Sequence, residues 1–194
     1  EDPAFFREDM KRTRYPQTAV ERSLLAVEDY VRDFAVDNPH VTVSMLRFSN
    51  VVGPEIRTPI THLLNLPVVP SIFGFAPRLQ FVHEHDVIRA VRFVLDNEVP
   101  GIYNVAGDGA LSIQQIAARL GKRCITLPPA ALRTVLAVLH PLGLSQYGPE
   151  QVNFLRYRPV LDNRRLKEVF GYVPRLTSAE VFELFRKARG LGPP

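Results

Sequence analysis

The apolar residues of this chain alternate between two spacings, and this alternation restricts the folds that the chain can adopt. The first helix-like segment has five apolar residues on one face: Val20, Leu24, Val27, Val31 and Phe34. Residues 41–48 then form a continuous β-branched and apolar run, which is typical of a buried strand. Strand patterns return at 79–83, 102–106 and 124–127, with helix patterns between them. Strands that alternate with helices predict an α/β fold in which crossover helices join parallel strands.

Several predicted helices begin with a recognisable local signature. A Ser or Thr is followed three residues later by Glu or Gln, the pattern of a capping box, at Thr18/Glu21, Ser112/Gln115 and Thr177/Glu180. Asp86 and Asp162 are predicted to cap two more helices. The apolar segment 129–144 has Arg133 as its only charged residue and predicts a buried helix. The alternative is an apolar surface for a hydrophobic substrate, a partner or a membrane face.

The composition excludes several classes of protein. The 194 residues contain 24 Lys and Arg against 20 Asp and Glu, a net charge of +4, and 46% are hydrophobic. This is the mixture of an ordinary globular protein, and four surplus charges spread along the chain predict no nucleic-acid partner. No apolar run reaches the ~18 residues that a membrane-spanning helix needs. The single Cys124 excludes a disulfide framework and favours the reducing cytoplasm.

The loop after the strand at 41–48 is the best place for a ligand. Ligands of open α/β sheets bind beyond the carboxyl ends of the strands. Ser49 and Asn50 supply hydrogen-bonding side chains there, and Gly53 and Pro54 turn the backbone away. A binding loop and an ordinary solvated turn are both compatible with these residues.

Four segments carry motifs that occur together in a known family. They are residues 47–54 (RFSNVVGP), 80–87 (QFVHEHDV), 101–107 (GIYNVAG) and 162–174 (DNRRLKEVFGYVP). In this order, over most of residues 20–185, they resemble the NAD-dependent epimerase/dehydratase family, the extended short-chain dehydrogenase/reductases. Each motif is short, but four in register make the resemblance specific.

The resemblance implies the later part of a Rossmann-like parallel sheet together with a small α/β substrate-binding domain. Residues 1–54 would belong to the dinucleotide-binding domain and residues 55–194 mainly to the substrate-binding domain, with 79–107 returning to the Rossmann sheet. The family's glycine-rich dinucleotide fingerprint is absent from the sequence. The chain also opens at Glu1 on a polar stretch, without methionine or signal peptide. We therefore expect it to be the C-terminal portion of a longer protein.

The resemblance also implies ligands and the residues that bind them. NAD or NADP would lie against Phe48 and Ser49. A nucleotide sugar or similar substrate would be bound by Asn50, Arg78 and Arg158, because guanidinium groups suit a diphosphate. The implied activity is that of an oxidoreductase or isomerase, such as a UDP-sugar 4-epimerase, which oxidises and re-reduces its substrate. The family commonly pairs through the helix that corresponds to residues 18–37, which implies a homodimer.

One part of the family's active site is missing. Family members use a tyrosine and, four residues later on the same helix face, a lysine. None of the six tyrosines in this chain is followed by lysine at that spacing. Ungapped alignment from Arg47 places Val20 and Leu24 at the two positions, where the apolar stripe predicts core packing. Tyr15, in the loop before the helix, is the remaining catalytic candidate. Two hypotheses stay open: an atypical enzyme, inactive as this fragment alone, and a binding or regulatory scaffold.

Residues 83–86 have four consecutive side chains that could ligate a metal. The resemblance explains His83 as the end of a strand and Asp86 as a helix cap. No third ligand is suggested nearby, so we predict that no metal is bound here.

Overall fold

The computed structural model describes residues 5–10, 15–16, 18–139 and 160–192. The strands of this part of the chain are β1 (Ser44–Phe48), β2 (Asn50–Val52), β3 (Val68–Ile72), β4 (Arg78–Leu79), β5 (Phe81–His83), β6 (Gly101–Val105), β7 (Leu111–Ser112) and β8 (Arg123–Leu127). The helices are α1 (Ala19–Asp37), α2 (Pro59–Asn65), α3 (Glu84–Asn97), α4 (Ile113–Arg119), α5 (Pro129–Leu139), α7 (Arg164–Glu168) and α8 (Ser178–Ala188).

Strands that lie far apart in the sequence pair with one another, mostly in parallel. β1 pairs with β6, β2 with β5 and β3 with β8, all parallel, whereas β4 and β7 are antiparallel. Parallel pairing requires a long crossover between the partners, and helices such as α3, between β5 and β6, provide it. The predicted α/β class with parallel strands is therefore confirmed.

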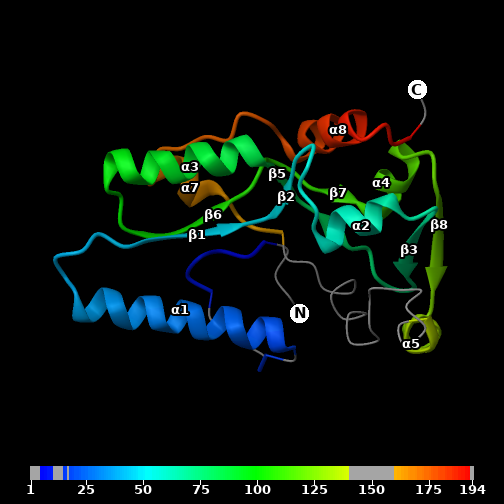
Figure 1. Ribbon diagram of the computed structural model, residues 1–194, viewed down its shortest axis with the longest axis horizontal. Coiled ribbons are helices and arrows are strands. Elements are labelled where there is room, and N and C mark those ends of the chain that lie inside the picture. Colours follow the sequence, from blue (N-terminus) through cyan, green and yellow to red (C-terminus); the bar gives the residue numbers. More distant parts are fainter. Residues whose placement is uncertain (1–4, 11–14, 17, 140–159, 193–194) are drawn as a thin grey trace.

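Helices lie on both sides of the β1/β6 pair, with α3 and α7 on one side and α1 on the other (Figure 1). On the α3 side, Tyr103 of β6 packs on Phe170, which follows α7, with ring centroids 4.6 Å apart. Phe170 also contacts Phe93 of α3 at 5.0 Å. A second core joins β2 and β5 to α2, α4 and α8, where Phe81 meets Phe182 at 5.6 Å. These two apolar cores fix the strand ends described below.

The three predicted capping boxes are confirmed at the starts of α1, α4 and α8. Of the other two predicted caps, the one at Asp86 is wrong. α3 begins at Glu84, because the His83 ring accepts a hydrogen bond from the backbone N–H of His85 and occupies the N-cap. Asp86 lies fully buried within the first turn. Asn163 directly precedes α7, and its side chain makes no capping bond. The cap predicted at Asp162 is present, because Asp162 Oδ1 accepts from the backbone N–H of Arg164, the first residue of α7, at 3.0 Å.

The predicted burial of the apolar stripe on α1 is wrong. Leu24, Val27 and Phe34 are 63%, 60% and 39% exposed, and Val31 is half-buried, while the side chain of Val20 lies outside the described set. α1 is attached to β1 by an ion pair in which Arg47 donates from Nε and Nη2 to the two Glu28 oxygens, at 2.9 and 2.6 Å. Helical periodicity identifies an apolar face, but it does not supply an element to cover it. No described element covers this face of α1.

The helix predicted at 129–144 is present as α5, and residues 140–144 lie outside the described residues. Leu132 is buried against Ile72 of β3, whereas Val138 on the same helix is exposed. The interpretation as a buried helix therefore holds for one face. None of the helices in the described ranges is long and apolar enough to cross a membrane.

Candidate functional site

The candidate site lies at the carboxyl ends of β1 and β6, beside the first residues of β2 and β5. Ser49 joins β1 to β2, residue 106 follows β6, and Gln80 immediately precedes β5. Parallel strands bring their carboxyl ends to the same edge of a sheet, so these turns are natural positions for ligand-binding side chains. Gln80 is hydrogen bonded to Asn50, the first residue of β2, and to Gly107, which follows β6.

The structure brings Phe48, Ser49 and Asn50 together at this edge. Phe48 is half-buried against the core between β6 and α3. The backbone N–H of Ser49 donates to the Val105 carbonyl at 3.0 Å. The Asn50 amide side chain donates from Nδ2 to the Gln80 carbonyl at 2.7 Å, and its backbone N–H donates to the same oxygen at 3.2 Å. Asn50 is therefore held from both its main chain and its side chain.

The Ser49 hydroxyl is the atom in this group that most suggests a ligand. Its Oγ is buried and has no hydrogen-bond partner among the described residues. A buried hydroxyl without a partner costs about 1–3 kcal/mol relative to a hydrogen-bonded one. A polar group brought by a ligand would remove that cost, so this orphaned atom fits a bound cofactor.

The other predicted site residues are not joined to this group by any described contact. Arg78 is exposed on β4, opposite Ser112 of β7. Tyr15 is 91% exposed and precedes α1. Arg158 lies outside the described residues.

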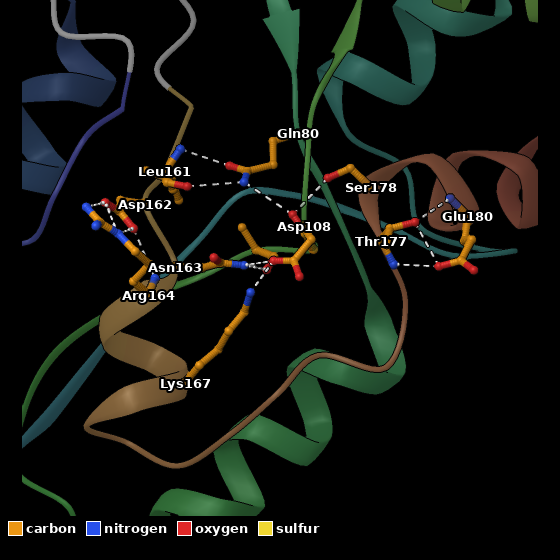
Figure 2. Close-up of polar contacts among 12 residues, drawn as sticks. Gln80, Asp108, Leu161, Asp162, Asn163, Arg164, Lys167, Thr177, Ser178 and Glu180 are labelled. Atoms are coloured by element: carbon orange, nitrogen blue, oxygen red, sulfur yellow. Dashed lines mark hydrogen bonds and ion pairs between the residues drawn. The ribbon is translucent and has the colours of Figure 1, made fainter.

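Gln80 is the centre of the polar contacts at the site (Figure 2). Its Nε2 donates to the carbonyls of Gly107 and Leu161, both at 3.2 Å, and its Oε1 accepts from the Leu161 N–H at 2.9 Å. Ser178 also reaches Gly107, donating from its hydroxyl at 3.0 Å and accepting from the Phe81 N–H at 3.1 Å. These two side chains connect the start of β5 and the turn after β6 to the start of α8 and to the segment before α7.

Asp108 anchors the same segment from the β6 side. Asn163 donates from Nδ2 to the Ala106 carbonyl and to Asp108 Oδ1, at 2.8 and 2.7 Å, and Lys167 of α7 forms an ion pair with the same carboxylate. Burial by itself would raise the pKa of Asp108, but the hydrogen bonds from Lys167 and Asn163 outweigh it and lower that pKa. The Asp108 carboxylate therefore stays charged as a structural acceptor.

His83 and His85 lie together at the start of α3. Burial, followed by the nearby His85 ring, lowers the pKa of His83 and favours the neutral imidazole that caps α3. The rings of the two histidines lie 4.9 Å apart. No group of three or more His, Cys, Asp and Glu side chains with metal-binding geometry occurs in the described ranges.

Sequence reasoning missed Gln80, Asn163 and Ser178. The only available signal was a polar residue inside an apolar strand pattern, since Gln80 stands between Leu79 and Phe81. Buried polar side chains within strands usually have specific hydrogen-bond partners. The partners of Gln80 lie 27 and 81 residues away, so the sequence did not identify them.

Comparison with known proteins finds relatives in sequence and in structure. No protein-family model matches the sequence. Uncharacterized proteins of Mycobacterium bovis and Mycobacterium tuberculosis are 31% identical to it over 192 residues, which cover 99% of this chain and 51% of each relative. The chain therefore spans about half the length of the curated relatives it matches.

Several solved structures share its fold. The dTDP-glucose 4,6-dehydratase of Bacillus anthracis, in complex with NAD, superposes with a TM-score of 0.67 at 16% identity, covering 98% of this chain and 57% of that one. The UDP-glucuronic acid 4-epimerase of Bacillus cereus, in complex with UDP-glucuronic acid and NAD, gives 0.67 at 15% identity with the same coverage. At these identities the similarity establishes the fold alone: the chain has a Rossmann-like α/β architecture with parallel strands.

Proposed function

We propose that this chain is the C-terminal portion of an NAD(P)-binding protein of the epimerase/dehydratase family that acts on a nucleotide sugar or a similar substrate. Residues 1–54 would complete the dinucleotide-binding domain, and residues 55–194 would form mainly the substrate-binding domain, with 79–107 in the Rossmann sheet. The parallel pairing of β1 with β6, across more than fifty residues, supports this division. The free, half-buried Cys124 is compatible with a cytoplasmic protein.

The Ser49 hydroxyl carries the proposal, because it is buried without a hydrogen-bond partner among the described residues and lies at the strand edge where ligands of this fold class bind. Phe48 and Ser49 would contact the dinucleotide, and Asn50, oriented by Gln80, would contact the substrate. Arg78 and Arg158 are proposed as diphosphate ligands. A bound NAD or NADP would supply a hydride acceptor and donor.

A non-catalytic scaffold is the second candidate, and one observation favours it. Leu24, which aligns with the family's catalytic lysine, is an exposed apolar side chain that cannot hold a ribose or lower the pKa of a tyrosine. Tyr15 is the proposed replacement acid/base if catalysis is retained. Conversion of UDP-glucose to UDP-galactose, assayed with NAD present, separates the two candidates. Conversion that is lost in Tyr15→Phe supports the enzyme, whereas tight NAD binding without conversion of UDP-sugars supports the scaffold.

The full-length protein is expected to bind one dinucleotide per protomer. Native mass spectrometry, on protein purified without ligand and then titrated with NAD and NADP, measures this directly. Ser49→Ala should weaken the binding about 5–10-fold, the effect of one lost hydrogen bond. Ser71→Ala is a matched control, because Ser71 has another buried, unpartnered hydroxyl within the described residues, on β3. Equal affinities for the two variants would remove Ser49 from the site, and no binding to folded protein would contradict the enzyme hypothesis.

We also propose that α1 forms a homodimer contact. Val27, Tyr30 and Phe34 are 60%, 71% and 39% exposed, and their spacing places them on one side of the helix. A second copy of this helix would bury that side. Val27→Glu should convert a dimer of the full-length protein to monomer in sedimentation velocity.

Val36→Glu is the control for this prediction. Val36 is also exposed but lies nine residues further along, two and a half turns, and thus on the opposite side of α1. It should leave the dimer intact. A wild-type monomer, or equal dissociation by both variants, would refute the contact.

A further inference from the structure

We propose that Gln80 is a positioning residue that couples the substrate-binding loop at Asn50 to the segment 160–163. This inference rests on the proposed function, in which Asn50 binds a nucleotide sugar. Gln80 contacts both parts: its main-chain carbonyl is hydrogen bonded to Asn50, and its side-chain carboxamide is hydrogen bonded to Leu161.

The side chain of Gln80 is hydrogen bonded to main-chain groups of other segments. Gln80 is 4% exposed, and its carboxamide is hydrogen bonded to Gly107 after β6 and to both backbone groups of Leu161. A carboxamide that donates to the carbonyl and accepts from the N–H of the same residue is fixed in both distance and orientation. The carboxamide therefore sets the position of the peptide at residue 80 relative to the segment at Leu161.

The main-chain carbonyl of Gln80 in turn fixes the position of Asn50. It accepts from the Asn50 side chain at 2.7 Å and from the Asn50 backbone at 3.2 Å. Movement of the peptide at residue 80 would consequently move the carboxamide of Asn50. The strand pairing of Asn50 with Phe81 continues the same connection into β2 and β5.

The segment on the other side is itself anchored, so it can serve as a reference point. The Asp162 N–H donates to the Phe6 carbonyl at 2.9 Å, and the Phe6 N–H donates to the Val160 carbonyl at 2.8 Å. The Asn104 side chain, from β6, donates to the carbonyls of Phe6 and Asp162 at 2.8 and 3.1 Å. Gln80 thus links a loop proposed to bind substrate to a backbone segment that is also hydrogen bonded to Phe6 and Asn104.

The test replaces Gln80 by leucine, which keeps the side-chain volume and removes all three hydrogen bonds. In the full-length protein, Gln80→Leu should raise the Kd for UDP-glucose about 10-fold and change the Kd for NAD by about 2-fold or less, both measured by titration calorimetry. Hydrogen exchange should show about 10-fold faster exchange at the Leu161 amide, with the Phe6-bonded Asp162 amide less affected. Gln80→Glu, which retains an acceptor for the Leu161 N–H, replaces the leucine variant if that variant does not fold.

Ser178→Ala is the matched control, because it removes hydrogen bonds to Gly107 and Phe81 without touching residues 160–163. Ser178→Ala should lower the melting temperature without changing the ratio of the Kd for UDP-glucose to the Kd for NAD. Equal weakening of both ligands by Gln80→Leu, or the same pattern in Ser178→Ala, would overturn the positioning role. If wild-type protein binds no UDP-glucose, the proposed function fails, and unchanged exchange at Leu161 in the variant would independently overturn the coupling.

Discussion

Gly107→Ala is expected to destabilise the protein by about 3 kcal/mol, the upper part of the usual range for forcing extra atoms into a packed site. A Cβ at this position would lie 2.8 Å from the carbonyl oxygens of Phe81 and Leu176 and 2.9 Å from the backbone nitrogen of Ser178. All three are main-chain atoms, so no side-chain rotation can relieve the contact. Gly107 also donates to Phe81 and accepts from Gln80 and Ser178. Urea denaturation followed by circular dichroism measures the loss.

Gly109→Ala separates crowding from backbone conformation. Gly109 has φ of +74°, and a Cβ there would meet nothing within 4 Å. Its substitution should cost about 1–2 kcal/mol, the strain of a left-handed residue with a side chain. If Gly109→Ala costs as much as Gly107→Ala, the close approach of three backbone segments at Gly107 does not limit stability. NAD binding should also weaken in Gly107→Ala, since the turn after β6 belongs to the proposed site.

Local sequence patterns predicted the features of the fold that depend on local interactions. The capping boxes at Thr18, Ser112 and Thr177 join residues three positions apart, so their residue types were sufficient. The α/β class followed from the alternation of spacings along the whole chain. The cap of α3 was mispredicted because Asp86, a good capping residue, is bonded instead to Tyr172, 86 residues away.

Features that depend on distant partners could not be predicted in the same way. The apolar pattern of α1 indicated one face, but Leu24 and Val27 remain exposed because no described element packs there. The loop residues Ser49 and Asn50 could be chosen as candidates from their position after a strand, whereas Gln80, which is hydrogen bonded to Asn50, could not. Its backbone carbonyl carries no sequence signal at all, since every residue has one.

Removing the buried carboxylate at Asp86 is expected to have the largest effect among the side-chain changes. Its Oδ1 accepts from Arg89 Nη2 and Tyr172 Oη, both at 2.7 Å, and from the Arg175 N–H at 3.2 Å. Asp86→Ala should cost about 3–5 kcal/mol, because it leaves the partly buried Arg89 without its counter-ion and the Tyr172 hydroxyl without its acceptor. Asp96→Ala, at the exposed end of α3, is the control and should change stability by about 0.5 kcal/mol or less.

The pH dependence of unfolding tests the same contacts at both acidic and alkaline pH. Burial by itself would raise the pKa of Asp86, but the hydrogen bonds from Arg89, Tyr172 and Arg175 lower it below its usual 3.8. The Asp86 carboxylate therefore stabilises the fold above about pH 4, and its contribution is lost as the pH falls through the folded-state pKa.

Burial is the main factor that raises the pKa of Tyr172 from 10.0 to about 12. The contribution of Tyr172 to stability is therefore complete below pH 10 and is lost as the pH rises to 12. Tyr172→Phe should abolish this alkaline loss in urea midpoints measured from pH 8 to 12. If the variant keeps the wild-type alkaline slope, another group produces the loss.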